Sequence, residues 1–86
     1  MYRIEYLESV VKNDIPRITH SDRKRIRRAI EERLGKNPIE YGKPLQYSLK
    51  GCRRLRVGDY RVIYRIEDDK TVLIVKIGHR RDVYED

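Results

Sequence analysis

Cationic side chains are concentrated between positions 50 and 65, where the only acidic residue is Asp59. Cations that share one face of a strand repel one another, so such a cluster is unfavourable unless an anion is meant to occupy it. Arginine contacts phosphate through two parallel N–H donors, which makes a phosphate the natural occupant. We therefore expect a phosphate-binding face, with the protection of an edge strand by charge as the alternative. Its members are Lys50, Arg53, Arg54, Arg56, Arg61 and Arg65.

A second group of reactive side chains ends the chain, in the stretch IGHRRDVYED. Histidine titrates near neutral pH and tyrosine carries a phenolic proton, so His79 and Tyr84 are candidates for proton transfer. Arg80 adds a cation, and Arg81 is either a phosphate contact or a plain surface charge. These residues follow the last apolar run, and we expect them to form one wall of a site beside the arginine cluster.

The overall composition favours a nucleic-acid partner. The chain of 86 residues is long enough for a single domain, which we place at residues 1–86. Its formal net charge is +7 and its pI is about 9.8, values that attract polyanions, of which nucleic acid is the commonest and an anionic membrane the rival. No stretch is apolar enough to span a bilayer and no signal-peptide pattern opens the chain, so we expect a cytoplasmic protein without a membrane partner.

The cysteine content argues against a disulfide and against a metal centre. Cys52 is the only cysteine, so no internal disulfide can form, and no set of thiol ligands is available for structural zinc. We expect neither a metal nor a cofactor.

Hydrophobic periodicity predicts the elements that must position these residues. Residues 1–7 alternate as a strand, and residues 8–18 predict a helix with Ser9 as its cap and Pro16 shortening it. Residues 19–35 predict a second helix, with Thr19 as cap and Gly35 at its end. Residues 39–47 are interpreted as a loop.

Three further strands follow, at residues 52–57, 60–67 and 71–78, with turns at Gly58–Asp59 and at 68–70. In the first of them Arg54 and Arg56 oppose Leu55 and Val57, so the arginines face away from the helices. The predicted fold is α+β, with two N-terminal helices packed on one face of a small, mainly antiparallel sheet in the order β-α-α-β-β-β.

The ordered series RLRVGDYRVIY, an apolar strand and IGHRRDVY resembles the RelE toxins of toxin–antitoxin systems, in the RelE/ParE superfamily. The upstream stretches RIRRAIEERLGKNP and GKPLQYSLKG also fit that family. The resemblance implies a ribosome-dependent, metal-free endoribonuclease that cleaves messenger RNA in the ribosomal A site. It also implies a cognate antitoxin as partner in a heterocomplex, and contact with the ribosome, including its 16S RNA.

The resemblance also implies roles for single residues. Arg54 and Arg56 would bind the region of the scissile phosphate, where the best-known member has lysines. Arg61 would stabilise the pentacoordinate phosphate, Arg80 the developing charge or the leaving group, and Tyr84 would take part in proton transfer or stack on a base. Residues interpreted as RNA contacts are Lys50, Arg53, Arg65 and Arg81.

Arginine is a poor proton donor, so the replacement of the family's lysines leaves acid–base function open. We hypothesise that His79 or Tyr84 supplies it. Two other interpretations stay open: a ParE-like inhibitor of DNA gyrase, and a catalytically degenerate module that binds RNA or an antitoxin without cleaving RNA.

Overall fold

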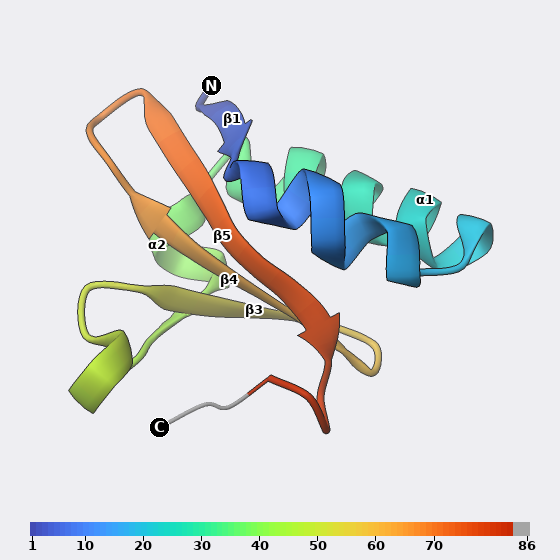
Figure 1. The fold of residues 1–86 in the computed structure, drawn as a ribbon. Coiled ribbons are helices and arrows are strands. Elements are labelled where there is room, and N and C mark those ends of the chain that lie inside the picture. The colour runs from blue at the N-terminus through green and yellow to red at the C-terminus, as the bar shows by residue number, and fades with distance from the viewer. Residues whose placement is uncertain (84–86) are drawn as a thin grey trace.

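A five-stranded sheet carries the fold, and the helices cover one of its faces (Figure 1). The computed structural model describes residues 1–83. The strand order is β1-β5-β4-β3-β2, in which β1 runs parallel to β5 and the other neighbours are antiparallel. The predicted α+β class is confirmed. The strands are β1 (Arg3–Tyr6), β2 (Lys43–Pro44), β3 (Arg53–Val57), β4 (Tyr60–Ile66) and β5 (Thr71–His79).

The first predicted helix is present in two short, irregular pieces, the π-helical η1 (Val10–Asp14) and the 3-10 turn η2 (Ile15–Arg17). Ser9 has helical dihedral angles and makes no capping hydrogen bond, so its prediction as cap was wrong. The change from a π-helix to a tighter 3-10 turn at η2 coincides with Pro16, which has no backbone N–H to continue the helix.

The second predicted helix forms as expected. It consists of α1 (His20–Ala29) and the π-helical turn η3 (Ile30–Leu34). The Thr19 hydroxyl accepts a hydrogen bond from the backbone N–H of Asp22 at 3.4 Å, which satisfies one of the free donors at the helix start. The apolar face of this second helix packs against the sheet in the main core.

The predicted loop at 39–47 contains structure that the sequence did not suggest. Pro38 opens a short helix, α2 (Pro38–Tyr41), which is followed by β2 and a 3-10 turn, η4 (Tyr47–Leu49). The sheet holds α2 through two side chains. The buried Tyr64 hydroxyl donates to the Pro38 carbonyl at 2.6 Å, and Arg53 donates to the Gly42 carbonyl at 2.8 Å and to that of Ile39.

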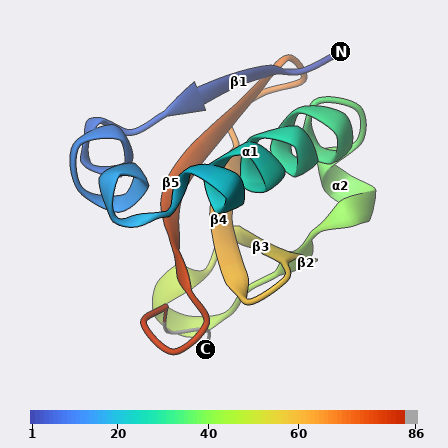
Figure 2. The same cartoon turned by 90° about the vertical axis from the view of Figure 1, so that its right-hand side faces the viewer.

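Each face of the sheet has its own apolar cluster. The helix side holds the larger one, which includes Leu55, Val57, Val62 and Tyr64. On the opposite side Leu45, Ile63 and Val83 form a smaller cluster under the η4 loop and the C-terminal turn, which both lie on that side (Figure 2).

A bulge in β5 decides which side chains of this strand face the helices. Tyr64 pairs with Ile74 but Ile63 pairs with Lys76, so Val75 is an extra residue between them. Strict alternation from Ile74 would turn Ile77 away from the helices. Because of the extra residue, Ile77 is instead buried in the main core.

The attachment of α2 predicts unequal effects of two neighbouring arginine substitutions. Arg53→Ala removes hydrogen bonds from a charged group to two carbonyls, so the free energy of unfolding should fall by about 1–3 kcal/mol. Arg56→Ala, at an exposed side chain that lies opposite Arg61, should leave it unchanged or raise it by up to about 1 kcal/mol. Urea unfolding of the two variants measures the difference, and equal losses would show that the Arg53 contacts do not hold α2.

The buried Tyr64 also predicts a loss of stability in alkali. Burial raises the pKa of Tyr64, although its hydrogen bond and charge interaction with Arg53 act in the opposite direction. Above about pH 10 the unfolded chain loses the phenolic proton first, so the free energy of unfolding should fall as the pH rises. In urea titrations between about pH 8 and 11, Tyr64→Phe should flatten this fall, and the exposed control Tyr41→Phe should leave it as in the unmodified protein.

Candidate functional site

Cations gather on the sheet face opposite the helices, and we call the four that lie on β3 or directly beside it the arginine face: Lys43, Arg54, Arg56 and Arg61. The pairing register places Arg56 directly opposite Arg61 and Lys43 directly opposite Arg54. Directly opposed like charges destabilise a sheet. Strands β2, β3 and β4 contain no aspartate or glutamate, so the strands themselves supply no compensating charge. The arginine face thus gathers positive charge to which an anion would be attracted.

Arg61 is the most enclosed member of the arginine face, with 8% of its surface exposed. Its guanidinium donates to the carbonyls of Gly58 and Tyr60, both at 3.1 Å. Gly58 has a φ of +59°, the left-handed conformation that the tight turn between β3 and β4 requires. The turn thus fixes the direction of the Arg61 side chain.

The same turn anchors Arg80. The Arg80 backbone N–H donates to the Asp59 carbonyl at 2.7 Å, and its guanidinium lies 3.7 Å from the Asp59 carboxylate. Both side chains of that ion pair are largely exposed, so it contributes little to stability. Its structural effect is to hold Arg80 at the end of the sheet where Arg61 is fixed.

His79 lies on the other side of the sheet. It pairs with Tyr60, whose side chain packs against the main core, and the two rings meet edge to face at 5.7 Å between centroids. The expectation that His79 stands beside the cluster of Arg56 and Arg61 is therefore wrong in its geometry. The bulge in β5 is the physical reason, because it reverses which side of the sheet His79 occupies.

The remaining predicted contacts are dispersed. Arg53 points toward the helix side and binds the carbonyls that hold α2, and Arg65 is exposed and paired with Glu67 at 2.8 Å. Lys50 is exposed beyond η4, and Arg81 is exposed in the C-terminal turn. Tyr84 lies outside the described residues. None of these placements assigns an RNA contact, and their proposed roles stay predictions.

A cavity of about 230 Å³ lies at the exposed edge of β5, between η2 and the C-terminal turn. We call it the edge cavity. Asp14, on η1, is buried beside it, and its carboxylate accepts from Lys76 Nζ at 3.1 Å and from the Ile77 N–H at 2.9 Å. His79 forms part of the wall. The cationic residues around the cavity are Arg17, Lys76 and Arg81.

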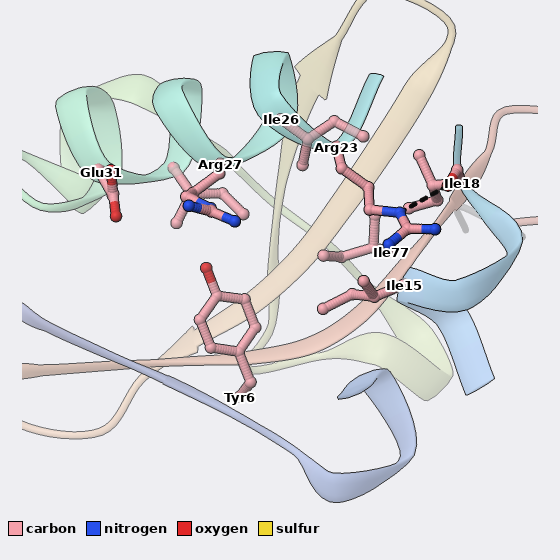
Figure 3. Close-up of a pocket in the computed structure, with 9 residues that line it drawn as sticks. Tyr6, Ile15, Ile18, Arg23, Ile26, Arg27, Glu31 and Ile77 are labelled. Atoms are coloured by element: carbon pink, nitrogen blue, oxygen red, sulfur yellow. Dashed lines mark hydrogen bonds between the residues drawn. The ribbon is translucent and has the colours of Figure 1, made fainter. Parts of the chain in front are cut away.

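A larger hollow, of about 340 Å³, lies between β1, η2 and α1 (Figure 3). Its lining is mainly isoleucine, and Arg23 crosses one end to donate to the Ile18 carbonyl at 2.7 Å. Tyr6 points into it, and burial, followed by the charge of Glu31, raises the pKa of its phenol while Arg27 lowers it. This hollow is on the helix side, away from the arginine face.

The chemistry available is that of cations and backbone-anchored guanidinium groups. Among residues 1–83, no group of three or more histidine, cysteine, aspartate or glutamate side chains gathers where it could hold a metal ion. Within the same range, no helix is long and apolar enough to cross a membrane. The arginine face can bind a phosphodiester and stabilise negative charge that develops on it.

Sequence reasoning missed three cations at these sites: Lys43, Lys76 and Arg17. Lys43 falls in the segment interpreted as a loop, because a strand of two residues leaves no periodic signal. Lys76 and Arg17 are 59 positions apart and meet only because η2 packs near the edge of β5. No local pattern in the sequence could have joined them.

The chain is similar to known toxins of toxin–antitoxin systems. The model of a family described as the ParE toxin of type II toxin–antitoxin systems, parDE, matches residues 4–84. Toxin RelG of Mycobacterium tuberculosis (strain ATCC 25618 / H37Rv) is 44% identical over 52 residues, 59% of this chain and 60% of that toxin. Toxin RelE of the same organism is 45% identical over 49 residues, 56% of this chain and 50% of that toxin. The alignments thus span little more than half the length of these relatives.

Solved structures show the same fold. A chain of the toxin–antitoxin complex RelBE2 from Mycobacterium tuberculosis superposes with a TM-score of 0.84 at 29% identity, covering 92% of this chain and 91% of that one. A chain of the RelB–RelE antitoxin–toxin complex from Methanococcus jannaschii has a TM-score of 0.69 at 23% identity, covering 93% and 94%. The resemblance to RelE toxins is confirmed, and because the family model covers nearly the whole sequence, this chain belongs to the ParE toxin family within the RelE/ParE superfamily of type II toxin–antitoxin toxins.

Proposed function

We propose that this toxin is a ribosome-dependent endoribonuclease that cleaves messenger RNA in the ribosomal A site. The observation that supports the proposal most directly is the opposition of Arg56 to Arg61 across two paired strands. A sheet that places two arginines directly opposite each other on one face is stabilised when a phosphate binds beside them. A protein acting on ribosomes in this way would work in the cytoplasm.

In the proposed reaction the ribose 2′-oxygen attacks the adjacent phosphorus and the bond to the 5′-oxygen breaks. Negative charge accumulates on the phosphate oxygens in the transition state, and donors fixed in advance stabilise it without reorganising. Arg61 suits this role because two backbone carbonyls fix its guanidinium. Arg54 and Arg56 would bind the phosphate from β3, and Arg80 would approach from the C-terminal turn.

The residue that transfers protons in this reaction is the next part of the proposal. His79 lies across the sheet from Arg56 and Arg61, so a direct acid–base role for it would require the RNA to pass around the end of β5. The resemblance to RelE toxins gives the C-terminal tyrosine, Tyr84 in this chain, a part in proton transfer. We therefore assign proton transfer to Tyr84 before His79.

Cleavage of programmed ribosomes tests the proposal. Purified protein, ribosomes carrying a defined message and primer extension should reveal cuts at A-site codons. Removing a donor that stabilises transition-state charge lowers a rate about 10²–10³-fold, which is the loss expected for Arg61→Ala and, at an exposed position, for Arg56→Ala. Arg33→Ala removes an exposed arginine from the helix side and should cleave as the unmodified protein does.

Thermal melts of each variant separate loss of function from loss of folding. Cuts that persist at full rate in folded Arg56→Ala and Arg61→Ala would refute the assigned roles. No cuts by folded protein that still binds ribosomes would favour the degenerate binding module. No cuts and no ribosome binding, with inhibition of supercoiling, would favour a gyrase inhibitor.

An antitoxin is the proposed protein partner, because structural neighbours of this chain are described as complexes of RelE-type toxins with RelB antitoxins. A segment suited to this toxin would carry acidic side chains to neutralise the arginine face and apolar ones to cover exposed apolar surface. Such a complex would block the approach of RNA to Arg56 and Arg61.

The partner's chemistry predicts how binding responds to charge. With the cognate antitoxin, the exchange Arg54→Glu with Arg56→Glu should weaken the complex at least tenfold in calorimetric titration, because attraction becomes repulsion. The matched exchange Arg28→Glu with Arg33→Glu changes the net charge equally on the helix side. Equal weakening by both exchanges would place the acidic segment elsewhere.

A further inference from the structure

The edge cavity combines more hydrogen-bond donors and positive charge than its structural role explains. Three cationic side chains line it, Arg17 from η2, Lys76 from β5 and Arg81 from the C-terminal turn, against the carboxylates Asp14 and Asp82. Three separate segments of the chain therefore bring cations to one space of about 230 Å³. A single water molecule needs only roughly 10–15 Å³ by this measure, so the space is large enough for a phosphate group.

Asp14 orders the cavity, and its ion pair with Lys76 offsets its negative charge. Both of its oxygens are engaged, one by Lys76 Nζ and one by the Ile77 N–H, and the side chain is only 7% exposed. An ammonium group has three N–H donors, so Lys76 keeps two for a ligand. The aliphatic part of Lys76 runs along β5, with its Cε 4.0 Å from where a Cβ atom on Gly78 would be. Nearly half of the Lys76 side chain is exposed.

His79 adds a further donor to the wall. Its Nδ1 accepts a hydrogen bond from the Arg81 backbone N–H at 3.3 Å, so the neutral ring carries its proton on Nε2. The edge contact with Tyr60 holds the ring beside the cavity. His79, which the bulge places on the opposite side of the sheet from the arginine face, can thus donate to a ligand at the edge of β5.

We propose that the edge cavity is a second RNA-binding site, in which Arg17, Lys76, His79 and Arg81 hold a phosphodiester next to the one on the arginine face. This inference rests on the proposed function for the identity of its ligand. The C-terminal turn joins the two sites, because Arg80 is anchored at the Asp59 turn and Arg81 lines the cavity. A strand of RNA that leaves Arg61 and Arg80 around the end of β5 meets the cavity next.

The phosphate has two sources, the message and ribosomal RNA, and binding measurements distinguish them. The variant Arg17→Ala with Arg81→Ala removes two exposed cations of the cavity. Its affinity for a short unstructured RNA oligonucleotide and for vacant ribosomes is measured over a series of salt concentrations. The control Arg28→Ala with Arg33→Ala removes the same charge from exposed positions on the helix side.

We expect the cavity variant to bind on the order of tenfold more weakly at low salt than the control. The slope of log affinity against log salt should fall by about 0.7 for each phosphate that the variant no longer binds. Asp82→Asn should tighten binding about two- to threefold, because it removes a carboxylate from the wall. Weaker binding of the oligonucleotide identifies the message as the source, and weaker binding of ribosomes alone identifies ribosomal RNA.

Equal affinity and equal salt slope in the cavity variant and the control would overturn the proposal, as would the absence of RNA binding by the unmodified protein. The fate of the proposed nuclease activity is read separately. If RNA binding depends on the cavity but no RNA is cleaved, the edge-cavity proposal is supported and the proposed nuclease activity is refuted. If cleavage is normal and the cavity variant binds RNA as the control does, the nuclease activity is supported and the edge-cavity proposal is refuted.

Discussion

Strand alternation under a single core is the constraint on which this molecule depends. Leu55, Val57, Val62 and Tyr64 must lie beneath the helices, and successive side chains of a strand point to opposite faces. A slip of one residue would expose that set and bury arginines in its place, so the register is strongly fixed. The burial of the apolar side therefore holds the cations of β3 and β4 together on the other face, although they repel one another.

The same constraint explains two different arrangements of charged groups. Some are paired with a partner on another element, and others lie opposite a group of the same charge. Where a charged group stabilises the fold, it has a defined partner: Arg53 binds the carbonyls around α2, and Asp14 binds Lys76 and the edge of β5. On the arginine face the strands present cation against cation. Stability is thus built from contacts across elements, and an anion bound where cations oppose one another would stabilise the folded state further.

Much of the fold could be predicted from the sequence because the signals are local. Thr19 and Gly35 bound the main helix, a two-residue turn joins β3 to β4, and alternation separates Arg54 and Arg56 from Leu55 and Val57. The features that the sequence did not predict depend on contacts between distant parts of the chain. The two-residue strand β2 exists only through pairing with β3, and the bulge in β5 exists only through pairing with β4. A single inserted residue moved His79 to the other face, and no pattern within residues 71–78 reveals it.

The bulge also links the two basic sites physically. It turns the Ile77 side chain into the core. The Ile77 N–H and Lys76 Nζ both donate to Asp14, and these contacts secure the part of β5 that β1 does not cover. Without the extra residue, His79 would join the arginine face and the edge of β5 would present a different row of side chains. Because bulges are found where a strand must re-aim side chains, its position four residues before His79 fits a strand that serves a ligand on each side. Under the proposed function, the geometry of β5, more than the number of arginines, would determine where RNA is held.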